Sequence, residues 1–159
     1  MDNIQNPCML ANMILSSAPA AIANISGSGI SGAVKFYQLE DKVLVVADIS
    51  GLPKGNGCDC RVFGFHIHEG ESCGGESFAD TKGHYNPSSC PHPCHSGDMP
   101  PLFGYDGKAW LAFVAARFNV FEIIGKTVVI HDMPDDFTTQ PAGNSGIKIA
   151  CGEIKKSAT

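Results

Sequence analysis

The stretch RVFGFHIHE, residues 61–69, alternates apolar side chains with small and histidine side chains. Successive side chains of a β-strand point to opposite faces, so His66 and His68 would share one face. The other face is apolar and carries Phe63, Phe65 and Ile67. The alternation predicts a strand with one face in a hydrophobic core and two imidazoles on the other. Such a pair suits copper, zinc, iron or nickel, although surface histidines also pair by chance.

Other short segments rich in Val, Ile, Phe and Ala are separated by turn residues. The predicted strands cover residues 32–38, 42–49, 108–118, 126–131 and 147–154. Residues 117–124 also allow a helix, but the dominance of Phe, Val and Ile favours strand and loop. The aperiodic segments 70–105 and 132–146 are predicted to be long functional loops. The pattern predicts an all-β sandwich or barrel, and no repeat or linker divides residues 1–159 into more than one domain.

Composition excludes some classes of function. The chain has 159 residues with 17% charged residues and a net charge of -5. This length is sufficient for one domain with a hydrophobic core. The sequence contains no basic run or basic-aromatic patch, so nucleic acid is not an expected partner. It also contains no apolar stretch long enough to span a membrane.

The first residues raise the question of a secretory leader. Residues 9–23 are mildly apolar and end in small side chains, as a leader would. However, the residues before them include Asp2 and no Lys or Arg, and Pro19 interrupts the apolar run. We therefore expect a cytoplasmic protein whose residues 1–17 are flexible or loosely attached. It would be periplasmic or extracellular if a leader has been removed.

All six histidines lie within residues 66–131. The segment HYNPSSCPHPCHSGD, residues 84–98, contributes three of them and a carboxylate: His84, His92, His95 and Asp98. Three imidazoles and one carboxylate satisfy a closed tetrahedral zinc site. Prolines in this segment stiffen the loop and reduce the entropy lost on ligation. The alternative is a disulfide-stapled loop in which the histidines are incidental.

Several motifs, in collinear order between Ile30 and Ile154, together resemble the copper-zinc superoxide dismutases, particularly the bacterial branch. They are GFHIHEGESC (64–73), GHYNP (83–87), HSGD (95–98), GKTVVIHDMPDD (125–136) and GNSGIKIACGEI (143–154). The resemblance implies a Greek-key, eight-stranded β-barrel of immunoglobulin-like sandwich architecture with two long functional loops.

The resemblance also implies roles for individual residues. Four copper ligands are implied: His66, His68, His84 and His131. Four zinc ligands are implied, with His84 bridging the two metals: His84, His92, His95 and Asp98. Asp135 matches an aspartate that hydrogen-bonds histidines of both sites and so fixes their orientation. Cys73 and Cys151 match a disulfide that ties the metal loop to the last strand.

The implied activity is dismutation of superoxide to dioxygen and hydrogen peroxide by copper that is reduced and reoxidised, with His84 carrying a proton. Lys148 stands where the family has an arginine that orients the anion. Residues 132–146 form a shorter loop than is typical and contain no Lys or Arg. Because lysine lacks the planar fork of arginine, and because fewer charges steer the substrate, we expect a slower enzyme.

A second class of function stays open. It is a non-catalytic copper- or zinc-binding module of the same fold that delivers or stores copper. The complete set of copper ligands favours the enzyme. A homodimer is one assembly compatible with the resemblance, since the family is commonly dimeric.

The other cysteines leave alternatives open. Cys90 and Cys94 flank the expected zinc ligands and form a small disulfide or donate a thiolate to zinc. Cys58 and Cys60 form a CxC pair that is either free or an accessory copper-handling site. With Cys8 the chain has seven cysteines, and the odd number leaves at least one thiol or an intermolecular bond.

Overall fold

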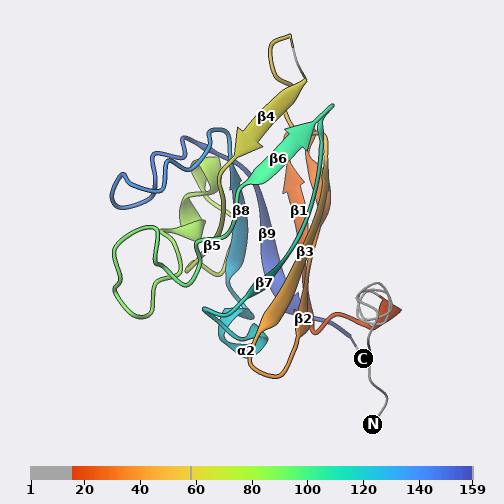
Figure 1. Ribbon diagram of the computed structural model, residues 1–159, viewed down its shortest axis with the longest axis vertical. Helices are drawn as coiled ribbons and strands as arrows, with labels where there is room; N and C mark the ends of the chain where they lie inside the picture. The colour runs from red at the N-terminus through yellow and green to blue at the C-terminus, as the bar shows by residue number, and fades with distance from the viewer. Residues whose placement is uncertain (1–15, 58, 159) are drawn as a thin grey trace, which may run out of the picture.

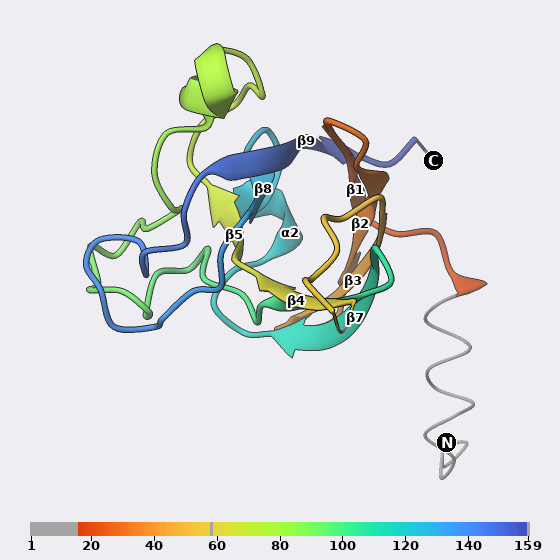
Figure 2. The ribbon, with the colours of Figure 1, turned by 90° about the horizontal axis from the view of Figure 1, so that it is seen from above.

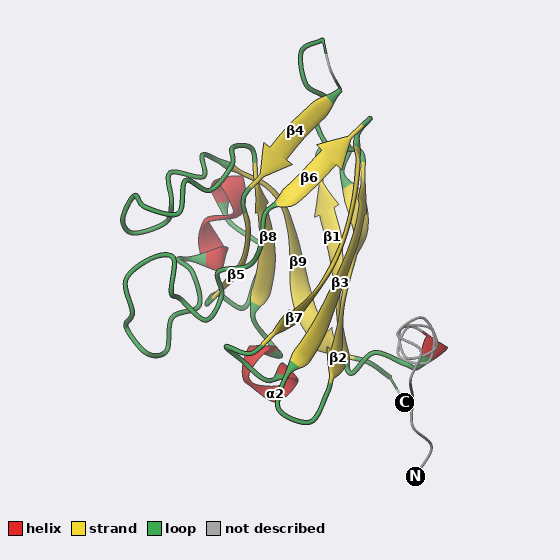
Figure 3. Ribbon diagram, in the orientation of Figure 1, coloured by secondary structure: helices red, strands yellow, loops and turns green. Residues whose placement is uncertain are grey.

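The computed structural model describes residues 16–57 and 59–158 (Figure 1). Its strands are β1 Ala21–Gly27, β2 Ser31–Gln38, β3 Val43–Ser50, β4 Cys60–Phe63, β5 Phe65–His68, β6 Leu102–Tyr105, β7 Lys108–Ala115, β8 Thr127–His131 and β9 Lys148–Lys156. The helical elements are η1 Glu76–Thr81 and α2 Val120–Ile123. Apart from these short helices, the described chain is mostly strand and loop (Figure 3), which confirms the all-β prediction.

The strands pair in the order β4-β6-β7-β3-β2-β1-β9-β8-β5, and all pairs are antiparallel. The connections from β3 to β4 and from β7 to β8 join strands that are not neighbours, as in a Greek key. The two edge strands, β4 and β5, follow each other directly in the chain. The sheet therefore curls into a nearly closed barrel, which Figure 2 shows as a ring of strands.

The sheet has nine strands, where eight were expected, because the predicted strand 61–69 divides at Gly64. The Gly64 N–H donates to the Met133 carbonyl at 2.7 Å, and the His131 N–H donates to the Gly64 carbonyl at 2.8 Å. On one side of this glycine the chain pairs with β6, and on the other with β8. A Cβ atom at position 64 would lie 2.8 Å from the Cβ of Ser145, so a side chain has no room there.

The core fills the inside of the barrel. Phe63, Phe65 and Ile67 are completely buried in it, which confirms the apolar face predicted for residues 61–69. Alternating side chains of β2 and β3 are also buried in this core. They include Val34, Phe36, Val43, Val45, Ala47 and Ile49. The histidine face of β5 therefore points away from this core, towards the long loops.

Three local predictions were wrong. Strand β1 was missed, although Ala21, Ala23 and Ile25 are buried in alternation, because the preceding residues suggested a leader. The loop 70–105 contains η1 and β6. Within residues 117–124 the chain forms α2, because Asn119 and Glu122 make a capping box that satisfies the first N–H groups of the helix.

The two long loops lie on the same side of the barrel, beside β5 and β8 (Figures 1 and 2). The disulfide implied by the resemblance is present between Cys73 and Cys151, with a Cα–Cα distance of 5.7 Å. It links the first loop to β9 across 78 positions of sequence. Among the described residues, no helix has the length and apolar character needed to cross a membrane.

Candidate metal centre

The edge of β5 organises the site. Because β5 has a barrel neighbour on one side only, its other edge pairs with the loop that carries the remaining histidines. The Ile67 N–H donates to the Gly97 carbonyl at 2.9 Å, and the Tyr85 N–H donates to the Ile67 carbonyl at 2.8 Å. Short bridges thus place Asp98 opposite His66, and His84 opposite His68.

One group of side chains lies between β5, β8 and this loop. It contains His66, His68, His84 and His131, whose potential ligand atoms lie within 4.8 Å of one another. All four residues are buried. The Nε2 atoms of His68 and His131 are 3.2 Å apart. The Nδ1–H of His68 donates to the Lys82 carbonyl at 2.9 Å, which leaves Nε2 as the free donor atom for a metal.

A second group lies in the loop itself. It contains His84, His92, His95 and Asp98, again with potential ligand atoms within 4.8 Å of one another. Asp98 Oδ1 lies 2.8 Å from His84 Nδ1, and Asp98 Oδ2 lies 3.1 Å from His92 Nδ1. His95 Nδ1 lies 3.4 Å from His84 Nδ1. Three imidazoles and one carboxylate therefore converge on one point.

His84 belongs to both groups. Its Nδ1 faces the second group, as the contacts with Asp98 and His95 show. Its Nε2 is buried and has no hydrogen-bond partner among the described residues. The two ring nitrogens of an imidazole point to opposite sides, and the His84 and His66 ring centres are 4.0 Å apart. Nε2 is therefore the atom that His84 offers to the first group.

Asp135 contacts one histidine of each group. Its Oδ2 lies 2.7 Å from His66 Nε2, and its Oδ1 lies 2.9 Å from His92 Nε2. The backbone N–H of Phe137 also donates to Oδ1, at 2.7 Å. Burial acts to raise the pKa of Asp135, but these hydrogen bonds outweigh burial and hold the pKa well below its usual range. The carboxylate is therefore charged and fixes both rings.

Four histidines of the site have a pKa below the ordinary value and are therefore held in the neutral form. Burial is the main cause that lowers the pKa of His66, His68 and His95, and it lowers the pKa of His131 to about 3. Neutral imidazole is the form that binds a metal ion. These four side chains are thus held in the form that binds a metal, without a competing proton.

The residues fit a pair of metal ions. Three buried ring nitrogens lack a hydrogen bond among the described residues: His66 Nδ1, His84 Nε2 and His92 Nδ1. His92 Nδ1 is close to Asp98 but without hydrogen-bond geometry. Buried polar atoms without partners destabilise a fold, and coordination would satisfy all three. The first group offers imidazole nitrogens alone, which suits copper, and the second offers a closed tetrahedral set, which suits zinc.

Lys148 lies at the edge of the first group. It is the first residue of β9 and pairs with His131 of β8. Its Nζ donates to Thr81 Oγ1 at 2.7 Å and to the Lys82 carbonyl at 2.9 Å. The same carbonyl accepts the hydrogen bond of His68. The ammonium group is half-buried, and burial lowers the pKa of Lys148.

The cysteine predictions are corrected in part. Cys90 and Cys94 are free thiols, so the small disulfide expected between them is wrong, and neither belongs to the second group of ligand atoms. The side chain of Asn86 holds the backbone N–H and carbonyl of Cys90, and Cys94 closes a turn on Pro91. Cys60 is a free, exposed thiol. Cys8 and Cys58 lie outside the described residues.

Sequence reasoning missed two residues that contact the second group through its backbone. Gln140 bonds to the backbone of His92, and Arg117 to the carbonyls of Pro93 and His95. Neither residue lies in a motif or cluster, and only the folded structure brings them to the loop.

The geometry agrees with comparisons to known proteins. Residues 30–154 match the model of the family described as copper/zinc superoxide dismutase (SODC). Superoxide dismutase (Cu-Zn) 2 of Aquifex aeolicus is 33% identical over 153 residues, covering 87% of this chain and 86% of that protein. A copper chaperone for superoxide dismutase of Sus scrofa is 32% identical over 149 residues, covering 87% of this chain and 54% of that protein.

A solved structure gives the same result. The crystal structure of a double mutant of a SOD-like protein from Bacillus subtilis superposes with a TM-score of 0.70 at 28% identity. The match covers 82% of this chain and 94% of that one. Together with the family model, which spans most of the chain, and with the bacterial relatives, these likenesses establish that the chain belongs to the copper/zinc superoxide dismutase family, in its bacterial branch.

Proposed function

We propose that this protein is a superoxide dismutase that converts superoxide to dioxygen and hydrogen peroxide with one copper and one zinc ion. The observation that carries the proposal is the position of His84. This residue offers one ring nitrogen to a complete group of four histidines and the other to a group of tetrahedral zinc type. Copper bound in the first group would supply the one-electron redox couple that the reaction needs and that zinc lacks.

The protein's own residues supply the proton and the geometry. His84 Nε2, which has no partner among the described residues, is the atom at which a proton can be taken up and returned. Its Nδ1 stays in contact with Asp98, so the ring keeps its place while Nε2 changes its proton. Asp135 holds His66 and His92 in fixed orientation.

Access to the site suits a small anion. A cavity of about 340 Å³ lies over His131 and is lined by residues 139–142 and 144–146. These lining residues carry no charged side chain. The cation that attracts the substrate is Lys148, next to His131. One lysine and a neutral rim support the expectation of a slower enzyme than one with an arginine and a charged rim.

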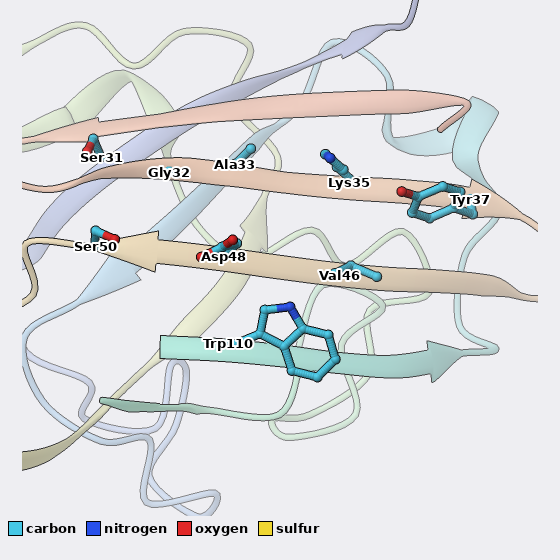
Figure 4. Close-up of a pocket in the computed structure, with 9 residues that line it drawn as sticks. All are labelled: Ser31, Gly32, Ala33, Lys35, Tyr37, Val46, Asp48, Ser50 and Trp110. Atoms are coloured by element: carbon cyan, nitrogen blue, oxygen red, sulfur yellow. The ribbon is translucent and has the colours of Figure 1, made fainter. Parts of the chain in front are cut away.

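The barrel also has a shallow pocket of about 550 Å³ away from the histidines (Figure 4). It lies on the outer face of β2, β3 and β7, where Trp110 of β7 pairs with Asp48 of β3, and Lys35 of β2 pairs with Val46 of β3. No histidine or cysteine lines it. A two-atom substrate needs no pocket of this size, so we give it no part in the proposed reaction.

The second candidate function is a non-catalytic copper- or zinc-binding module. It is favoured by the relatives named copper chaperones and by the SOD-like protein of Bacillus subtilis. The four histidines of the first group argue against it, because that set is complete in this chain.

Metal content measured together with superoxide consumption separates the two functions. The metal-free protein is loaded with one equivalent each of copper and zinc, and superoxide decay is followed by stopped flow. We expect second-order consumption far above the spontaneous rate, which disappears on removal of copper. A protein that retains both metals and does not accelerate the decay would contradict the proposal and favour the binding module.

A further inference from the structure

The short segment from His92 to His95 carries two ligands of the second group with only two residues between them. Its backbone is held from outside the loop. The His92 N–H donates to Gln140 Oε1 at 3.0 Å, and Gln140 Nε2 donates to the His92 carbonyl at 2.7 Å. One amide side chain thus satisfies both backbone groups of a ligand residue, as a neighbouring strand would.

Arg117 holds the other end of the segment. It lies between β7 and α2, and its Nη1 donates to the Pro93 carbonyl at 2.8 Å and to the His95 carbonyl at 3.2 Å. Gln140 comes from the loop between β8 and β9. The two side chains therefore reach the same four residues from two separate parts of the barrel.

These contacts differ from that of Asp135, which bonds to the ring of His92. Gln140 and Arg117 touch backbone atoms only, so they set where the segment lies rather than the chemistry of its rings. The free energy of metal binding includes the cost of ordering the ligands. A segment already held at His92, Pro93 and His95 loses less backbone freedom when a metal binds.

We propose that Gln140 and Arg117 are positioning residues that brace residues 92–95 and so slow the loss of zinc from the second group. This inference rests on the proposed binding of zinc there. Both residues are exposed, so replacing them leaves the hydrophobic core intact. The brace acts directly on the second group, because none of the four ligands of the first group lies in residues 92–95.

The test compares zinc release from Gln140→Met, Arg117→Ala and Arg117→Lys with release from the unaltered protein, using a colorimetric chelator. Loss of these hydrogen bonds should speed zinc release by about five- to tenfold in Gln140→Met and Arg117→Ala. Copper release should change by less than about twofold, since its other ligands lie outside the braced segment. Arg117→Lys should release zinc more slowly than Arg117→Ala. In the unaltered protein a single nitrogen of Arg117 makes both hydrogen bonds, and the lysine ammonium group can replace it in part.

The control variants are Thr138→Ala, in the same loop as Gln140, and Lys42→Ala, an exposed cation in the β2–β3 turn. Both should release zinc at the unaltered rate. A second readout needs no metal: hydrogen exchange of the His92 amide in the metal-free protein should be faster in Gln140→Met, because that N–H loses its acceptor.

Unchanged zinc release and unchanged amide exchange in Gln140→Met, with unchanged release in Arg117→Ala, would overturn the brace while leaving the proposed function standing. Equal acceleration of copper and zinc release would also overturn it, since that indicates general loosening. If the unaltered protein retains no zinc, the proposed zinc binding fails, and the amide exchange still decides whether Gln140 holds the segment.

Discussion

At the scale of single residues, Asp135 joins the two halves of the site. It is buried, charged and bonded to His66 and His92 at once. The isosteric change Asp135→Asn keeps the shape but cannot accept hydrogen bonds from both rings as an ionised carboxylate does. We expect zinc affinity to fall by about 10- to 100-fold. Competition with a chelator measures this, and an affinity within a factor of two of the unaltered protein would contradict the assigned role.

Substitutions of Lys148 test whether this residue limits the rate of superoxide consumption. Lys148→Arg should raise the second-order rate of superoxide consumption by about two- to fivefold, because guanidinium binds a small anion with two donors. Lys148→Met should lower it by about tenfold through loss of the attracting charge. Stopped-flow measurement at low and high salt gives both rates. If Lys148→Met consumes superoxide as fast as the unaltered protein, the lysine has no role in capturing the proposed substrate.

The same lysine predicts a dependence on pH. Burial lowers the pKa of Lys148 from its ordinary 10.5. The lysine therefore loses its positive charge at a lower pH than an exposed lysine does. The rate of superoxide consumption should therefore fall at alkaline pH in the unaltered protein. It should hold to higher pH in Lys148→Arg, since arginine stays charged. If the rate falls over the same alkaline pH range in both proteins, deprotonation of Lys148 is not the cause of the fall.

At the scale of elements, the edge of β5 holds the histidine loop, and Gly97 is where the two backbones meet. A Cβ atom at this position would lie 2.2 Å from the Ile67 carbonyl oxygen, whereas a Cβ atom at Gly83 would have nothing within 4 Å. Gly97→Ala should destabilise the protein by about 1–3 kcal/mol and weaken metal binding, because the loop must move off β5.

Gly83→Ala serves as the matched control and should keep both stability and metal affinity. Denaturant unfolding of the metal-free proteins measures the first, and chelator competition the second. Equal stability of the two variants would show that the loop is not held by its pairing with β5.

The strands and loops also show which features of the structure could be predicted from the sequence. The alternation of residues 61–69 was sufficient to predict the buried aromatic face and the histidine face, because period two leaves little choice once one face is apolar. The division at Gly64 was not predictable, since it depends on contacts with Met133 and His131, far away in the chain. The clustering of ligands was predictable from motifs, whereas Gln140 and Arg117 meet the loop only through the tertiary fold.

At the scale of the whole molecule, buried histidines make the stability of the metal-free protein depend on pH. The unfolded chain protonates its histidines below about pH 6.5. Burial lowers the pKa of His66, His68 and His95 in the fold, and it lowers the pKa of His131 to about 3. The unfolded state therefore binds more protons in this window, and stability falls as pH falls. The loss can reach about 1.4 kcal/mol per histidine for each pH unit.

Urea unfolding of the metal-free protein at pH 7.5 and pH 5 measures this loss. The pKa values of Asp98 and Asp135 are lowered, so these carboxylates lose their stabilising charge only below about pH 4 and do not mask the effect. Equal unfolding free energies at the two pH values would show that the site histidines are not buried as neutral groups.

The central claim is that His84 joins two metal ions through its two ring nitrogens. Loading copper into both groups tests this most directly, because an imidazole that bridges two Cu(II) ions couples their unpaired electrons. In the unaltered protein we predict that this coupling strongly diminishes the Cu(II) signals in the low-temperature electron paramagnetic resonance spectrum. In the His84→Ala variant we predict that the Cu(II) signals reappear. Two full, independent Cu(II) signals in the unaltered protein would contradict the claim.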